Sequence, residues 1–172
     1  VLGEDGEDRY EMAGVDFEDA FHTILLREAD RGVMAFKTLK GWAVFTRLCC
    51  GMAGAPVVWC RTSAAGCRLS QACFLPHELR IQCYVDDPAL AVRGSKAQRS
   101  WLLGCCLLFW VVLGFKFNWG KGHRGQQIPW IGAVISIDQR TFGKNKQLYF
   151  GTLVKLAPDK FQELRDSVDQ LH

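Results

Sequence analysis

The 172-residue chain predicts an α+β fold in which an antiparallel sheet is backed by helices on one face. Short β-prone runs alternate along the chain with longer segments that have helical periodicity. Two of the β-prone runs, 81–85 and 89–93, flank a short turn and predict a hairpin. Strands are therefore expected at 10–16, 42–48, 81–85, 89–93 and 128–137, and helices at 55–72, 95–113 and 158–170.

The length of 172 residues and the hydrophobic content of 49% predict one folded domain with a sizeable core. Residues 1–12 contain five acidic residues and one basic residue, whereas the remainder contains 20 basic and 13 acidic residues. Residues 1–9 are expected to form a solvated acidic tail. The basic remainder is compatible with a nucleic-acid backbone but does not by itself indicate one.

Eight cysteines raise the question of zinc or disulfides. Cys49-Cys50 and Cys105-Cys106 are adjacent pairs, and no C-x-x-C element occurs. This spacing argues against structural zinc. Most of the cysteines are instead interpreted as small buried hydrophobic residues of a protein in a reducing compartment.

The apolar run 101–115 raises the question of a membrane span. Its 15 residues fall short of the roughly 18–20 that a bilayer core requires. Ser95 and Gln98 have capping-box spacing, and Gly114 provides a stop signal, so a buried helix is predicted. Residues 1–10 lack the character of a cleavable signal. An intracellular protein, cytoplasmic or nuclear, without stable membrane association is expected, and a small membrane-associated protein is the disfavoured alternative.

Three carboxylates are predicted to meet at strand ends. Asp86 and Asp87 follow the β-prone run 81–85, and Asp16 ends another such run. Adjacent acidic residues usually belong to a turn or a solvated patch. Three clustered carboxylates, however, repel one another and raise one another's pKa unless a cation is bound. Hard oxygen ligands select Mg²⁺ or Mn²⁺, and two such ions about 3.5–4 Å apart can support phosphoryl displacement. The chemistry indicated is nucleotidyl transfer.

Five segments in order give the chain a resemblance to the palm of a reverse transcriptase from a retrotransposon or a retrovirus-type polyprotein. They match an Asp-x-x-x-Ala-aromatic block, a Gly-Met-x-x-Ala-Pro block, a Tyr-x-Asp-Asp box, a Gly-x-x-x-Asn segment and a Gly-containing strand that grips the primer. In this chain they are 16–24 (DFEDAFHTI), 49–59 (CCGMAGAPVVW), Tyr84-Val85-Asp86-Asp87, 113–121 (LGFKFNWGK) and 130–135 (WIGAVI).

The resemblance implies an RNA-directed DNA polymerase with a palm and part of the fingers at 10–157 and the start of a thumb helix at 158–172. It assigns the catalytic carboxylates to Asp16, Asp86 and Asp87, with the carbonyl of Phe17 as a further ligand of two Mg²⁺ ions that Mn²⁺ can replace. The implied partners are an RNA template, a DNA primer and a deoxynucleoside triphosphate. Flanking polyprotein domains are an open possibility.

The same resemblance assigns the nucleotide and primer contacts. Deoxynucleotide binding falls to Asp19, Ala20, Phe21, Cys50, Gly51 and Lys121. The ring of Phe21 would exclude a ribose 2′-OH, and Lys121 would approach the phosphates. Primer binding falls to Tyr84, Trp130, Ile131 and Gly132.

Several positions have simpler interpretations or depart from the family pattern. Phe21 is also compatible with a core aromatic, Lys121 with a solvated loop charge and Asp19 with a helix cap. Pro88 has no N–H, so its strand is expected to begin at an unpaired or edge position of the sheet. Cys50 and the cysteine before it replace the family's Pro and Phe or Gln. A catalytically inactive or domesticated remnant that binds RNA–DNA hybrid is the alternative function. The chain also starts close to its first motif, so it is expected to be partial and to have little activity in isolation.

Overall fold

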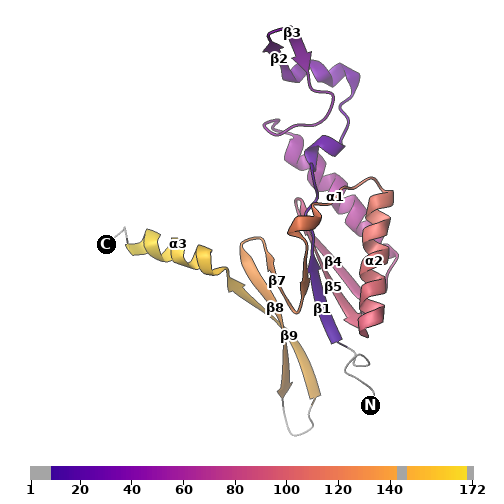
Figure 1. Ribbon diagram of the computed structural model, residues 1–172, viewed down its shortest axis with the longest axis vertical. Coiled ribbons are helices and arrows are strands. Elements are labelled where there is room, and N and C mark those ends of the chain that lie inside the picture. Colours follow the sequence, from indigo (N-terminus) through magenta and orange to yellow (C-terminus); the bar gives the residue numbers. More distant parts are fainter. Residues whose placement is uncertain (1–8, 143–146, 170–172) are drawn as a thin grey trace.

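The computed structural model describes residues 9–142 and 147–169. Its centre is a four-stranded sheet in the order β4-β5-β1-β6, in which all neighbouring strands are antiparallel (Figure 1). These strands are β1 (Arg9–Gly14), β4 (Leu79–Tyr84), β5 (Asp87–Gly94) and β6 (His123–Gly125). β4 and β5 form the predicted hairpin. Of the predicted acidic tail, only Arg9 is described, and it begins β1.

Two long helices cover this sheet and confirm the predicted α+β class. They are α1 (Ala55–Ala72) and α2 (Lys96–Val112), which lie together beside the sheet (Figure 1). The core between helices and sheet contains the fully buried Trp59 and Trp110, with strand residues such as Leu79, Leu90 and Val92. Burial alternates along β5, as expected for a strand with one face on a core.

The ends of α2 follow the predicted local signals. Ser95 and Gln98 form a complete capping box, in which the Ser95 hydroxyl accepts from the Gln98 backbone N–H and the Gln98 side chain accepts from the Ser95 N–H. Gly114 adopts φ 90° immediately after the helix, and the Phe115 N–H reaches the Trp110 carbonyl at 3.0 Å. This left-handed glycine terminates the helix, as in a Schellman motif.

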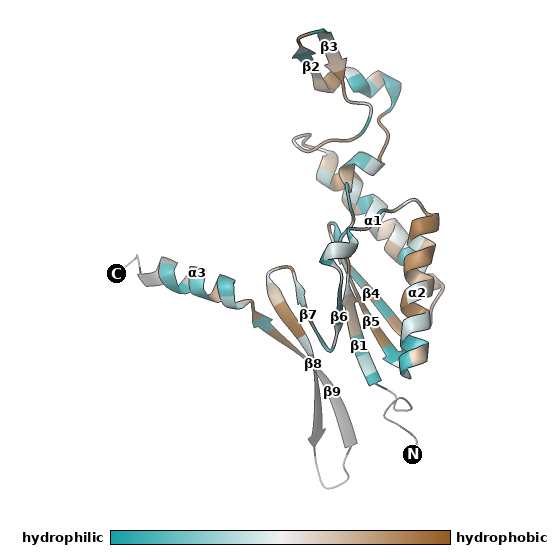
Figure 2. Cartoon of the chain, viewed as in Figure 1, coloured by the Kyte–Doolittle hydropathy of each residue, from teal (hydrophilic) through white to brown (hydrophobic). Residues whose placement is uncertain are grey.

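The prediction that α2 is simply buried is wrong for its outer face. Leu103, Cys106 and Trp110 face the core, but Trp101 and Val112 remain 73% and 75% exposed. The hydrophobic colouring of the C-terminal half of α2 in Figure 2 therefore includes surface residues. Within the described ranges, no helix has both the length and the apolar character needed to cross a bilayer.

The strand predicted at 128–137 is two strands. β7 (Gln127–Trp130) and β8 (Ala133–Phe142) are joined by Ile131 and Gly132, whose φ angles are 46° and 75°. Two consecutive left-handed residues are typical of a tight hairpin turn. β9 (Gln147–Leu156) pairs with β8 and completes a three-stranded sheet. In Figure 1 the central sheet lies between this three-stranded sheet and the two long helices.

The remaining elements surround this centre. β2 (Ala35–Thr38) and β3 (Gly41–Val44) form an exposed hairpin at the far end of the molecule, and β3 is shorter than the predicted strand 42–48 (Figure 1). The predicted helix at 158–170 is α3 (Pro158–Asp169). Short 3₁₀ helices, none of which was predicted, are η2 (Phe21–Thr23), η3 (Glu28–Met34) and η4 (Trp119–Lys121).

Pro88 lies on an interior strand and not on an edge strand, but on the side of β1 it falls beyond the last ladder pair, so of the two predicted positions the unpaired one is observed. It is fully buried in β5, which lies between β4 and β1. The Val15 N–H donates to the Pro88 carbonyl at 3.2 Å, but Pro88 has no N–H to return. The ladder between β1 and β5 accordingly ends at the preceding pair, Gly14 and Ala89. The missing donor thus falls where β1 stops, which lets the proline occupy an interior strand.

Candidate active site

The turn of the β4–β5 hairpin presents Asp86 and Asp87. Tyr84 pairs with Asp87, so Val85 and Asp86 form the connection. Val85 has φ 55°, a left-handed conformation that is unusual for a β-branched residue and costs about 1–3 kcal/mol. The buried Trp59 of α1 donates its indole N–H to the Val85 carbonyl at 2.9 Å. A core side chain therefore holds the strained turn.

Backbone hydrogen bonds bring Asp16 beside this turn. The Phe17 N–H donates to the Asp86 carbonyl at 3.0 Å, which fixes the segment after β1 to the hairpin. On the other side, the Asn118 N–H donates to the Asp16 carbonyl at 3.0 Å. Phe17 itself is buried and stacks against Phe117. The three carboxylates predicted to meet are thus brought to neighbouring positions.

The electrostatics of Asp87 show how close these groups are. Burial raises the pKa of Asp87, and the negative charges of Asp86 and Asp16 raise it further, while Lys121 acts in the opposite sense. Lys121 also pairs directly with Asp16, with Nζ 3.1 Å from Oδ2. The site therefore concentrates negative charge that one ammonium group only partly offsets.

A cleft of about 490 Å³ opens in front of these residues. One wall carries Asp16, Asp87 and Lys121, and residues 129–132 around the turn between β7 and β8 form another wall. The indole N–H of Trp130 donates to the Asp87 carbonyl at 2.9 Å, which ties the two walls together. We call this space the acidic cleft; its described lining is Gly14, Val15, Asp16, Asp87, Gly120, Lys121, His123 and residues 129–132.

The donor set fits a hard divalent cation. Carboxylate oxygens from two separate segments converge on one cleft, and Mg²⁺ typically takes only one or two protein carboxylates. Among the described residues, no group of three or more His, Cys, Asp or Glu side chains is arranged closely enough to hold a metal ion. A bound ion would therefore need oxygen ligands from water or substrate in addition to these side chains.

Comparison with known proteins settles the family. The family "Reverse transcriptase (RNA-dependent DNA polymerase)" matches residues 7–135, which is most of the chain. The chain belongs to the reverse transcriptase family. None of the curated proteins matches it.

Solved structures agree with a reverse transcriptase fold. The chain is 15% identical to the foamy viral protease-reverse transcriptase in complex with RNA/DNA hybrid, with a TM-score of 0.63 over 90% of this chain and 18% of that one. It is 17% identical to the foamy viral protease-reverse transcriptase in complex with dsDNA, with a TM-score of 0.56 over 73% of this chain and 26% of that one. The chain thus spans about a fifth to a quarter of the length of these structures.

The other predicted nucleotide-binding residues lie outside the described lining of the acidic cleft. Asp19 has φ 50° and is exposed, and Ala20 is buried. Phe21 is half-buried and meets the ring of Trp59 edge-on, with centroids 6.5 Å apart. The core interpretation of Phe21 is therefore partly correct.

The block before α1 shows why a glycine stands at position 51. Gly51 has φ 93°, but a side chain there would meet nothing within 4 Å in the described structure. The glycine is required by its backbone conformation rather than by close packing within the chain. Cys50 beside it is exposed, as is Tyr84 at the hairpin.

Sequence reasoning missed several parts of the site. His123 and Pro129 line the acidic cleft, and the indoles of Trp59 and Trp130 hold the turn. These tryptophans stand inside recognised motifs, but nothing local to them indicates a hydrogen bond to a carbonyl that is 26 or 43 residues distant in sequence.

Proposed function

We propose that the chain carries the polymerase centre of an RNA-directed DNA polymerase from a retrotransposon or a retrovirus-type polyprotein. It would add deoxynucleotides from their triphosphates to a primer 3′-OH on an RNA or DNA template. The observation that carries this proposal is that Asp16 and Asp87 line one cleft, with Asp86 next to them in the hairpin turn, in a chain of the reverse transcriptase family.

The carboxylates of Asp16, Asp86 and Asp87, with the carbonyl of Phe17, would hold two Mg²⁺ ions, for which Mn²⁺ is a possible substitute. When bound, such ions stabilise the attacking and leaving oxygens of an in-line phosphoryl displacement. Burial, and then the charges of Asp86 and Asp16, raise the pKa of Asp87, and a divalent cation bound beside these carboxylates would favour their ionised form.

The chain's own cations and amides would hold the triphosphate. Lys121 already lies at the acidic cleft, so its ammonium group is placed to meet phosphate oxygens. The backbone N–H groups of Asp19 and Ala20 would bind the phosphates, and Cys50 and Gly51 would approach the nucleotide. Phe21 would exclude a 2′-OH, and its packing against Trp59 supports a fixed ring position.

The primer end would meet the turn between β7 and β8. Trp130, Ile131 and Gly132 line the acidic cleft together with Asp87, and Tyr84, which pairs with Asp87 in the β4–β5 hairpin, is exposed. Two of the similar structures are complexes with RNA/DNA hybrid and with dsDNA. A template–primer duplex running past this turn, bound through its shape and backbone, is consistent with that likeness.

Primer extension on an RNA template tests the proposal. A protein that contains these 172 residues is expected to extend a DNA primer with Mg²⁺ or Mn²⁺, and the Asp86→Asn/Asp87→Asn variant is expected not to. Extension that persists unchanged in the double variant would contradict the assignment of the carboxylates.

One observation favours the alternative of an inactive remnant that binds RNA–DNA hybrid. Nζ of Lys121 lies 3.1 Å from Oδ2 of Asp16, so an ammonium group is paired with a carboxylate oxygen that a metal ion would need. Hybrid binding without extension, in either metal, would support this alternative over the polymerase.

A further inference from the structure

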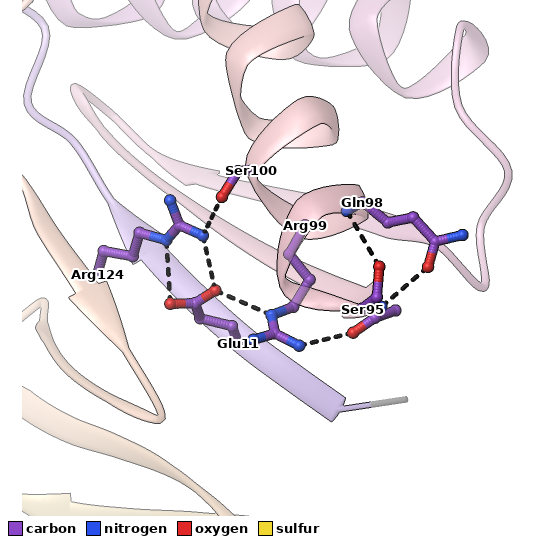
Figure 3. Close-up of polar contacts among 7 residues, drawn as sticks. Glu11, Ser95, Gln98, Arg99, Ser100 and Arg124 are labelled. Atoms are coloured by element: carbon purple, nitrogen blue, oxygen red, sulfur yellow. Dashed lines mark hydrogen bonds and ion pairs between the residues drawn. The ribbon is translucent and has the colours of Figure 1, made fainter. Parts of the chain in front are cut away.

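A cluster of one carboxylate and two guanidinium groups ties three elements together (Figure 3). Glu11 on β1 accepts two hydrogen bonds from Arg124 on β6, from Nε to Oε1 at 3.0 Å and from Nη2 to Oε2 at 2.9 Å. Arg99 on α2 donates its Nε to the same Oε2 at 3.0 Å and its Nη1 to the Gly94 carbonyl at 2.6 Å. Nη2 of Arg124 also donates to the Ser100 hydroxyl at 2.9 Å.

The two guanidinium groups determine the charge state of Glu11. Only 18% of its side chain is exposed, and this burial acts to raise its pKa. The hydrogen bonds and charges of Arg124 and Arg99 outweigh burial and hold the pKa of Glu11 below its usual range. Glu11 is therefore a carboxylate whose two oxygens are fixed in direction by the guanidinium groups.

β6 depends on this contact more than the other strands do. It is three residues long and lies at the edge of the sheet, where it pairs only with β1. Within this short ladder Arg124 pairs with Ala13, and His123 pairs with Gly14. Short edge strands hold their register weakly, so the two-point bond from Arg124 to Glu11 adds a side-chain constraint to three residue pairs.

The segment that carries Lys121 is held at both ends, by the hydrogen bond from the Asn118 N–H to the Asp16 carbonyl before it and by the pairing of β6 with β1 after it, so the register of β6 fixes one of these two ends. Lys121 ends η4, just before β6, and its Nζ is 3.1 Å from Asp16, which follows β1. A shift of β6 along β1 would move this ammonium group away from the acidic cleft. Arg99 binds the same carboxylate but connects it to α2, so it has no such link to Lys121.

We propose that Glu11 and Arg124 are positioning residues for Lys121: by fixing β6 in register on β1, they hold the Lys121 ammonium group at the acidic cleft. The proposal rests on the proposed function, because the part that Lys121 plays in nucleotide addition belongs to it. Arg99 provides a matched control, since its replacement removes a hydrogen bond to Glu11 without releasing β6.

Hydrogen exchange in the free protein tests the positioning without any activity. The Asn118 N–H donates to Asp16 and the Lys121 N–H donates to Asn118, so both amides report on this segment. Arg124→Gln is expected to speed their exchange by about tenfold, and Arg124→Lys to restore part of the protection. Arg99→Gln is expected to change them less than about twofold. Equal exchange in Arg124→Gln and Arg99→Gln would overturn the proposal.

A double-mutant cycle on single-nucleotide addition tests the consequence. Arg124→Gln is expected to slow addition by about tenfold when Lys121 is present, and by less than about twofold in a Lys121→Met background. Equal slowing in both backgrounds would mean that Arg124 acts only through stability and would overturn the proposal. If the unmodified protein adds no nucleotide, the proposed function fails, while the exchange measurement still decides the positioning.

Discussion

At the scale of single residues, the carboxylate-bearing turn is held by two indole groups from different parts of the chain. Trp59 binds the carbonyl of Val85, and Trp130 binds the carbonyl of Asp87. Without Trp59 the left-handed Val85 would lose a hydrogen bond that offsets part of its backbone strain. The buried tryptophan therefore contributes to the site as well as to the core.

Replacing Trp59 by Phe is expected to lower the free energy of unfolding by about 2–3 kcal/mol, because the Val85 carbonyl keeps only the weak bond from the Cys83 thiol and the core loses volume. Trp110→Phe is the control. Trp110 is equally buried, but its indole nitrogen has no hydrogen-bond partner in the described structure. Trp110→Phe is expected to lower the free energy of unfolding by about 1–2 kcal/mol less than Trp59→Phe does. Urea unfolding measures both, and equal losses would refute the role of the Trp59 hydrogen bond.

The pH dependence of stability should reveal the pairing of Glu11. Its pKa is lowered in the folded state, so its ionised form contributes stability above the ordinary value of 4.5. That contribution is lost as the pH falls through the lowered folded-state pKa. Glu11→Gln is therefore expected to reduce stability by about 1–2 kcal/mol at neutral pH and by much less near pH 3. A pH-independent difference in urea unfolding would contradict the charged pair.

The sequence predicts the meeting of Asp16, Asp86 and Asp87 because each acid follows a recognisable β-prone run. It does not predict the partners of Glu11, which lie 88 and 113 residues further along the chain. Such pairs depend on how β6 and α2 are placed in three dimensions, and no local motif encodes that placement.

At the scale of elements, helix ends were predictable because their signals are local. Each signal lies within a few residues of the helix end that it defines: Pro56 at the start of α1, the capping box at the start of α2 and Gly114 at its end. Strands were harder. The tight turn at Ile131 was missed because Ile is not a residue that favours positive φ, and β6 was missed because it has only three residues.

Two glycines of the α2 region should respond oppositely to alanine. Gly114 has φ 90°, so Gly114→Ala is expected to destabilise the protein by about 1–2 kcal/mol. Gly104 lies within the helix with open space around its Cα, so Gly104→Ala is expected to stabilise it by about 0.5–1 kcal/mol. Thermal or urea unfolding measures both. The same sign for both would show that the left-handed cap is not formed.

At the scale of the whole molecule, the palm-like architecture follows from the pairing of a sheet with two helices that share one core. The alternation of strands and helices predicted that class. The three-stranded sheet of β7, β8 and β9 was not predicted, because its formation depends on the turn at Ile131 and Gly132, and Ile131 is not a residue typical of such a turn. This sheet matters for function, since its first turn supplies the second wall of the acidic cleft.

If the acidic cleft adds nucleotides, as we propose, single-turnover addition of one deoxynucleotide to a primer on an RNA template should depend on its carboxylates. Asp16→Asn is expected to reduce the rate by at least about a thousandfold, because a carboxylate of the cleft is lost. Glu18→Gln, an exposed acid on the same segment, is expected to leave the rate within about twofold. Equal rates for Asp16→Asn and Glu18→Gln would contradict the claim that chemistry takes place in this cleft.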